Sequence, residues 1–301
     1  MRTTRCRGSA GSRRVSLTLA DTDRDTHGGT GGGADVPPFY LPTGDEVELF
    51  RTAFELRIPV LLKGPTGCGK TRFVEYMAWD TRKQHTVPDS GPLVTITCHD
   101  DMTTSDLVGR YLLGNEGTTW LDGPLTRAVR EGGLCYLDEV VEARKDTTVV
   151  LHALTDHRRM LPIERLGTTI HAHPDFLLVM SYNPGYQASS KDLKPSTRQR
   201  FLAIEFDYPD EALEAEIIAH ESQADQATAT SLARLGSRLR RLDDVDVLDG
   251  PSTRLLVYAG SLIGRGVDPL RAVDVAVVQA TSDDRDVQDA VRQVARAVLG
   301  Q

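Results

Sequence analysis

The sequence predicts an α/β protein: a five-stranded parallel sheet with helices on both faces, followed by a small all-helical region. Up to residue 209, short apolar runs typical of buried parallel strands alternate with amphipathic helical stretches. After residue 209 the strand-like runs stop and only helical patterns follow. The five predicted strands are residues 58–64, 92–100, 133–140, 176–185 and 201–209.

Length and composition are those of a globular, soluble protein. The 301 residues are 40% hydrophobic, enough for one large or two modest domains. No apolar run reaches the length that crosses a bilayer, so we expect no membrane insertion and a cytoplasmic location. The net charge of −8 disfavours nucleic acid as a partner and favours protein.

The four cysteines lie far apart and form no CxxC pair. We therefore expect reduced thiols, with neither a zinc site nor a disulfide framework. Four histidines also cluster in sequence, but their spacing matches no metal-ligand pattern. These cysteines are Cys6, Cys68, Cys98 and Cys135, and the histidines are His152, His157, His171 and His173.

Three segments are predicted. Residues 1–35 are rich in Arg, Ser, Thr and Gly, which predicts a disordered tail. Residues 36–208 form the α/β domain, and residues 209–301 form the helical lid domain. A helix is expected before the first strand, with Gly44 and Asp45 at its start. Its apolar positions are Val47, Leu49, Phe50, Ala53 and Phe54.

The stretch "GPTGCGKT" fits the pattern GxxxxGK[ST] and lies between a predicted strand and a helix. Glycines let backbone N–H groups approach phosphates, and the helix presents its N-terminus to the anion. Lys70 is expected to reach the β- and γ-phosphates of ATP, and Thr71 to offer its hydroxyl to Mg²⁺. The residues expected to bind the nucleotide are Gly64, Pro65, Thr66, Gly67, Cys68, Gly69, Lys70 and Thr71.

Cys68 lies inside this loop and leaves two interpretations open. It is an oxidation switch if the helix N-terminus lowers its thiol pKa. The favoured alternative is a small residue at a position where only the backbone contacts the ligand.

Two further strand ends carry polar residues that suit phosphoryl transfer. The strand in "LCYLDEV" ends in Asp138, predicted to hold Mg²⁺ through water, and Glu139, predicted to polarise the attacking water. "FLLVMSYNP" ends in Asn183, a neutral amide that can orient this water without adding charge. A solvated acidic pair and a simple Asn-Pro-Gly turn are the alternatives.

Three arginines are candidates for contacts with the γ-phosphate. In "KPSTRQRF", Arg200 is the first choice and Arg198 the second for an arginine finger that reaches a neighbouring subunit. Arg254, in "PSTRLL", opens a predicted helix of the lid and is the candidate lid sensor. Ordinary surface arginines are the alternative in each case.

Together, "GPTGCGKT", "LDEV", "SYNPG", "STRQRF" and "PSTR" resemble the motifs of AAA+ ATPases. More narrowly, residues 40 to 260 resemble the CbbQ/NirQ/NorQ group of the MoxR branch. The resemblance implies a homo-oligomeric ring, usually a hexamer, that works with a von Willebrand factor A domain adaptor to remodel a target enzyme. Rubisco blocked by sugar phosphates is the first target it implies, and nitric-oxide reductase the alternative.

The same resemblance assigns two insertions to the pore or target side of such a ring. Residues 102–123 match the insertion in the second helix, and residues 158–175 match a hairpin with Leu166-Gly167 near its tip. From the residues alone, 158–175 already predicts a β-hairpin, because two alternating runs flank a glycine-containing turn. The chain departs from the group in its tail and in a long link at residues 80–92.

Two other function classes fit a phosphate-binding loop. A nucleic-acid motor is disfavoured by the acidic balance and by the lack of a basic strip with interleaved aromatics. A small P-loop kinase is disfavoured by the helical C-terminal region and the paired "DE".

Overall fold

The structure is a computed structural model that describes most of the chain from residue 36 onward. The predicted tail, residues 1–35, lies outside the described residues, as does Cys6. So does most of the long link expected at residues 80–92. The described residues are 36–84, 93–114, 117–144, 147, 149–184, 193–242 and 250–300.

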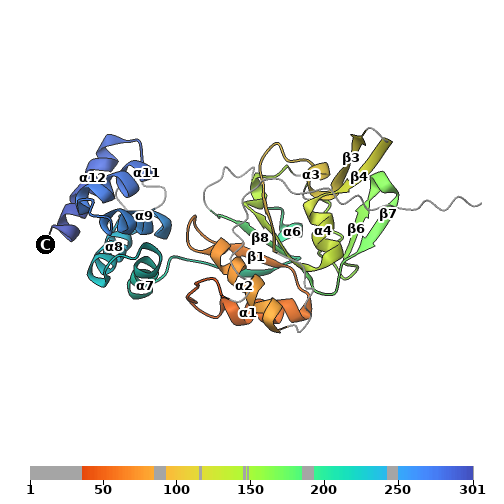
Figure 1. Cartoon of the computed structure of the whole chain (residues 1–301), viewed down its shortest axis with the longest axis horizontal. Helices are drawn as coiled ribbons and strands as arrows, with labels where there is room; N and C mark the ends of the chain where they lie inside the picture. Colours follow the sequence, from red (N-terminus) through yellow and green to blue (C-terminus); the bar gives the residue numbers. More distant parts are fainter. Residues whose placement is uncertain are drawn as a thin grey trace, which may run out of the picture. The chain divides into compact units, whose positions relative to one another are not determined.

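The central sheet has five parallel strands in the order β2-β5-β8-β1-β9, which confirms the predicted sheet. Figure 1 labels two of its strands, β1 and β8. Strand β8 is buried along its whole length, as expected for a central parallel strand. The first strand in the chain, β1, pairs with β8 and β9, so the segment that follows β1 leaves from the middle of the sheet. The strands are β1 (Val60–Lys63), β2 (Val94–Thr97), β5 (Gly133–Asp138), β8 (Phe176–Tyr182) and β9 (Leu202–Glu205).

Helices cover both faces of the sheet, because alternate strand residues enter two separate cores. Leu61 of β1 joins a core that contains Leu125 of α4. Its neighbours Val60 and Leu62 join a second core, which contains Phe73 of α2. The helices and 3-10 turn on the two faces are α1 (Glu46–Leu56), α2 (Lys70–Gln84), α3 (Thr104–Val108), α4 (Pro124–Glu131), η1 (Val140–Glu142) and α6 (Pro195–Arg198).

The start of α1 differs from the prediction. Asp45 is the N-cap residue but its side chain makes no capping hydrogen bond. Instead the buried carboxylate of Glu46 accepts hydrogen bonds from the backbone N–H groups of Thr43 and Gly44, each at 2.8 Å. Leu49, expected on the apolar face, is 37% exposed. The sequence could not show this, because burial of Glu46 depends on donors that the turn before the helix supplies.

Both predicted insertions form antiparallel hairpins, drawn close together in Figure 1. The first hairpin, β3 (Gly109–Gly114) with β4 (Gly117–Asp122), lies between α3 and α4 in the chain. The second, β6 (Met160–Ile163) with β7 (Thr168–His171), confirms the hairpin predicted from its alternating pattern. The hairpins touch, because the hydroxyl of Tyr111 donates to the backbone oxygen of Arg165 at 3.2 Å.

The C-terminal region is helical, as predicted, and has its own apolar core. Aspartate side chains cap α7, α8, α10 and α12 by accepting from backbone N–H groups of the first turn. Residues 274–278 form a π-helical turn, whose three consecutive residues Ala276, Val277 and Val278 are all buried. The elements are α7 (Glu211–Ser222), α8 (Gln226–Leu239), α9 (Thr253–Ile263), α10 (Pro269–Val273), η3 (Asp274–Val278), α11 (Gln279–Thr281) and α12 (Arg285–Leu299).

Within the described ranges, no helix is both long enough and apolar enough to cross a membrane.

Candidate nucleotide-binding site

The glycine-rich loop connects β1 to α2, as the sequence predicts. Its first glycine, Gly64, has φ +154, and a Cβ there would lie 2.3 Å from the backbone oxygen of Phe206. Gly67 has φ +72, and its Cβ would lie 2.5 Å from Cβ of Ser252. Both positions therefore require glycine for two reasons, backbone conformation and close approach of neighbouring atoms.

Lys70 begins α2 and folds its side chain back into the loop. Its ammonium nitrogen donates to the backbone oxygens of Gly64 and Pro65, each at 2.7 Å, and to the amide oxygen of Asn183 at 2.8 Å. The side chain is buried, and burial lowers its pKa. A buried ammonium held by neutral oxygens suits an incoming anion, so the residues present fit a nucleotide phosphate group.

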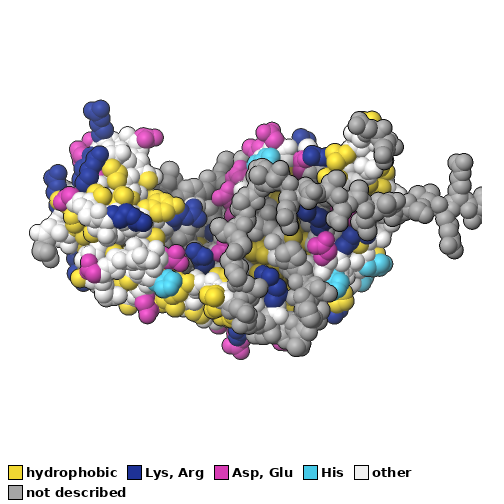
Figure 2. Space-filling view, in the orientation of Figure 1, with side chains coloured by type: hydrophobic (Ala, Val, Ile, Leu, Met, Phe, Trp, Pro, Cys, Tyr) yellow, Lys and Arg dark blue, Asp and Glu magenta, His cyan; other side chains and the backbone are white. Residues whose placement is uncertain are grey.

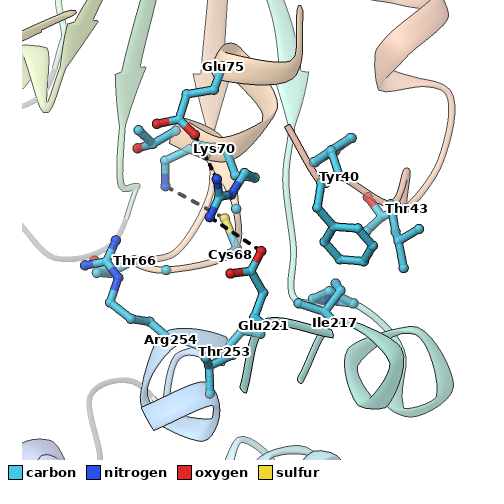
Figure 3. Close-up of a pocket in the computed structure, with 18 of the residues that line it drawn as sticks. Tyr40, Thr43, Thr66, Cys68, Lys70, Glu75, Ile217, Glu221, Thr253 and Arg254 are labelled. Atoms are coloured by element: carbon cyan, nitrogen blue, oxygen red, sulfur yellow. Dashed lines mark hydrogen bonds and ion pairs between the residues drawn. The ribbon is translucent and has the colours of Figure 1, made fainter. Parts of the chain in front are cut away.

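A cavity of about 510 Å³ opens over this loop. It brings together most of the residues that the sequence singled out, from the loop, the ends of β5 and β8, and α9 (Figure 3). The predicted residues that line it are Thr66, Gly67, Cys68, Gly69, Lys70, Thr71, Asp138, Glu139, Asn183 and Arg254.

The acidic pair lies at the carboxyl edge of the sheet, where the ends of parallel strands meet. Asp138 is the last residue of β5, and Glu139 follows it with a left-handed backbone, φ 54 and ψ 46. Two buried hydroxyls, those of Tyr136 and Ser181, donate to Asp138 Oδ1 at 2.7 and 2.5 Å. Neither hydroxyl was predicted from the sequence.

Asn183 follows β8 and contacts the loop with both ends of its amide. Its oxygen accepts from Lys70, and its nitrogen donates to the hydroxyl of Thr66 at 2.7 Å. The amide thus links the end of β8 to two loop residues that line the cavity.

The three candidate arginines are in different places. Arg254, exposed at the start of α9, lines the cavity, and Figure 3 shows its side chain extending toward Thr66. Arg200 does not line the cavity: its guanidinium donates to the backbone oxygen of His152 at 3.3 Å and lies 4.0 Å from Asp156. Arg198, the last residue of α6, does not line it either. The single chain therefore brings one of the three to this pocket.

The opposite wall of the cavity contains residues that the sequence analysis did not single out. They come from the segment before α1 and from α7 and α9, and several are apolar or aromatic, which suits a planar base. The side chains of Phe39 and His220 stack beside this wall, with ring centroids 3.5 Å apart. Aromatic residues just before a predicted helix were the available signal. This wall includes Phe39, Tyr40, Leu41, Thr43, Ile217, Val257 and Tyr258.

Cys68 is buried, and burial raises its thiol pKa although the nearby Lys70 opposes the rise. This corrects the premise of the oxidation-switch interpretation, which needs a lowered pKa. The structure instead accords with the favoured alternative, a small buried residue. Cys98 and Cys135 are also buried free thiols. In the described part of the chain, no group of three His, Cys, Asp or Glu side chains could hold a metal ion by itself.

Two family models match the chain. One describes an AAA domain of the dynein-related subfamily and matches residues 59–201. The other describes the CbbQ/NirQ/NorQ C-terminal region and matches residues 214–298. The first match spans the loop, the acidic pair and Asn183, and the second spans most of the helical region.

Three similar proteins match over most of their length. Protein CbbQ of Hydrogenophilus thermoluteolus is 56% identical over 262 residues, which covers 87% of this chain and 95% of that protein. Protein NorQ of Paracoccus denitrificans is 56% identical, and the match covers 90% of this chain and 97% of that protein. The denitrification regulatory protein NirQ of Pseudomonas aeruginosa is 56% identical, and the match covers 83% of this chain and 93% of that protein.

Proposed function

This chain belongs to the CbbQ/NirQ/NorQ family of AAA+ proteins, and we propose that it hydrolyses ATP with Mg²⁺ to remodel a target enzyme. The observation that carries the proposal is the cavity in which a buried ammonium, an acidic pair and a neutral amide meet. Lys70 begins α2, Asp138 and Glu139 lie at the end of β5, and Asn183 follows β8. All four residues line the same space.

Each of these residues has a role that follows from its chemistry. The ammonium of Lys70 and the backbone N–H groups of the loop would bind the phosphates. The hydroxyl of Thr71 and the carboxylate of Asp138 would hold Mg²⁺, which neutralises charge on the phosphates when bound. Glu139 would accept a proton from the attacking water, and the amide of Asn183 would orient that water. Arg254 would contact the nucleotide from α9.

Phosphate release by the purified protein tests this proposal. We expect Lys70→Ala to lose nucleotide binding, and Glu139→Gln to keep binding while losing turnover, because only the second residue acts in the chemical step. Lys194→Ala, at an exposed lysine outside the cavity, is the control and should behave as the wild type. Transfer of phosphate to an acceptor other than water would favour a kinase instead.

We further propose that the protein acts as a homo-oligomeric ring, hexameric as the family resemblance implies, together with a von Willebrand factor A domain adaptor. Rubisco is the first target we propose, and nitric-oxide reductase is the alternative. CbbQ, NorQ and NirQ relatives are each 56% identical to the chain, so identity favours neither target. On the face drawn in Figure 2, Lys and Arg side chains are interspersed with Asp and Glu, which gives no support to a nucleic-acid motor.

The target can be identified with the Glu139→Gln protein, which is expected to stay bound to ATP and to its partners. Capture with this variant in the presence of ATP should retain the target and the adaptor, and Lys70→Ala under the same conditions is the control. Recovery of activity by Rubisco inhibited with a sugar phosphate, dependent on ATP and the adaptor, would support the first target. Capture of nitric-oxide reductase without effect on Rubisco would support the alternative.

A further inference from the structure

Two fully buried hydroxyls lie directly behind the acidic pair. Tyr136 is on β5 and Ser181 is on β8, and both side chains are 0% exposed. The strands are neighbours in parallel register, with Leu137 opposite Met180. This register places Ser181 beside the end of β5, where Asp138 and Glu139 leave the sheet.

The hydrogen bonds of this group converge on one carboxylate oxygen. Tyr136 and Ser181 both donate to Asp138 Oδ1, at 2.7 and 2.5 Å. The hydroxyl of Ser181 in turn accepts from the backbone N–H of Glu139 at 3.2 Å. The two hydroxyls are 3.0 Å apart. Each hydroxyl has one proton, so with both protons on Oδ1 the other oxygen of Asp138 receives no hydrogen bond from this pair.

The surroundings of Tyr136 show that the core does not need its hydroxyl for packing. Its ring belongs to the apolar core that includes Leu62 and Phe73. A phenylalanine would fill this core without a buried hydroxyl that needs a partner. The hydroxyl therefore serves the carboxylate rather than the core.

Ser181 has a second consequence, because it also holds the backbone after Asp138. Glu139 has φ 54, a left-handed conformation that residues with a side chain rarely adopt. The hydrogen bond from its N–H to Ser181 ties this conformation to β8. One serine thus contacts both the carboxylate proposed to hold Mg²⁺ and the residue proposed to activate water.

We propose that Tyr136 and Ser181 are positioning residues of this site: Tyr136 orients the Asp138 carboxylate toward Mg²⁺, and Ser181 orients both that carboxylate and Glu139. This inference rests on the proposed ATP hydrolysis. It predicts that the two hydroxyls have different effects. Loss of the Tyr136 hydroxyl should weaken metal binding, whereas loss of the Ser181 hydroxyl should weaken metal binding and also slow turnover at saturating metal.

The test compares Tyr136→Phe and Ser181→Ala with the wild type in the full chain. Mn²⁺ replaces Mg²⁺ as the probe, and its binding in the presence of ATP is followed by electron paramagnetic resonance. ATP turnover at saturating Mn²⁺ is measured to compare the two variants. ATP binding without metal and thermal unfolding are measured alongside, because a merely structural defect would change these two quantities. Tyr182→Phe is the matched control, since it removes a tyrosine hydroxyl from the same strand as Ser181, and Tyr182 lies outside the cavity lining.

We expect both variants to unfold near the wild-type temperature and to bind ATP normally without metal. Their Mn²⁺ affinity should fall roughly 10- to 100-fold, the usual effect of removing a hydrogen-bond partner of a metal ligand. Wild-type Mn²⁺ affinity in both variants would overturn the inference, as would an equal loss in Tyr182→Phe. A wild-type protein that fails to bind or hydrolyse ATP would instead contradict the proposed function, so the two failures are distinguishable.

Discussion

The ammonium nitrogen of Lys70 lies 2.8 Å from the amide oxygen of Asn183, although the two residues are 113 positions apart in the chain. They follow β1 and β8, which are neighbours in the sheet. The same amide donates to the hydroxyl of Thr66, so the end of β8 is fastened to the loop at two points. Movement of the loop on phosphate binding would therefore also move the Asn183 side chain.

Replacing Asn183 with alanine should slow ATP hydrolysis more than it weakens ATP binding. The amide is proposed to orient the attacking water, and loss of one such group costs ~10² to 10³ in turnover. Lys70 keeps its two backbone oxygen partners in this variant, so phosphate binding should survive. Turnover and nucleotide affinity are measured separately, with Gln226→Ala as a control that removes an exposed amide on α8. A variant with normal turnover would show that the amide has no part in the chemical step.

Replacing Arg240 with alanine should strongly destabilise the helical region. Arg240 donates to both carboxylate oxygens of Glu214, at 2.7 and 2.8 Å, and Glu214 is 1% exposed. Removal of one partner leaves a buried charge uncompensated, which costs about 3 to 5 kcal/mol. The free energy of unfolding from urea titration measures the change.

The exposed pair of Arg234 with Glu211 is the matched control for that prediction. Arg234→Ala should change the free energy of unfolding by at most about 1 kcal/mol, as is usual for surface ion pairs. Equal losses of unfolding free energy in Arg240→Ala and Arg234→Ala would contradict the expectation that the buried ion pair stabilises the protein more than the exposed one.

The sequence predicted the sheet and the phosphate-binding edge because both depend on local patterns. Buried parallel strands are short apolar runs, and their polar ends meet at one edge whatever the order of the strands. Asp138 and Asn183 were found for this reason. The hydroxyl partners of Asp138 were not, because the contact of Tyr136 with Ser181 depends on the register of β5 against β8.

Which segments meet in the other wall of the cavity was not predictable, for a related reason. Phe39 and Ile217 come from segments far apart in the chain, and nothing in either segment indicates that they line the same space. The partial exposure of Leu49, which was expected on the apolar face of α1, has a different cause. Helical periodicity predicts which residues share a face, but it does not predict which of them are buried. In α1 the charged Glu46 is buried while Leu49 is 37% exposed.

The stability of the protein should decrease in alkali because of its buried thiols. Burial raises the pKa of both Cys98 and Cys135 to about 12, from an ordinary value of 9.0. A group with a raised pKa in the folded state contributes stability that is complete below its unfolded pKa and is lost as pH rises toward the folded value. The free energy of unfolding should therefore fall between about pH 9 and pH 12.

Cys135→Ala isolates this effect, because it removes one of the two thiols from the core. The small cavity should lower stability by a similar amount at every pH, while the alkaline slope becomes shallower than in the wild type. Denaturant titrations in reducing buffer at several pH values measure the slope. An identical slope in the two proteins would assign the alkaline loss to other groups.

Arg200 should act on the nucleotide of a neighbouring subunit, because it does not line the cavity of its own chain. In that case Arg200→Ala should bind ATP normally but lose ~10³ or more in turnover, the scale reported for arginine fingers of GTPases. Arg158→Ala is the matched control, since Arg158 pairs with the same carboxylate, Asp156, and is proposed for no role in catalysis.

Mixed rings give the decisive measurement. Lys70→Ala subunits retain Arg200 as the proposed finger, and Arg200→Ala subunits retain an intact nucleotide pocket. Partial recovery of turnover on mixing the two inactive proteins would show action between subunits. Full wild-type rates in both Arg200→Ala and Arg198→Ala would remove both arginines as finger candidates.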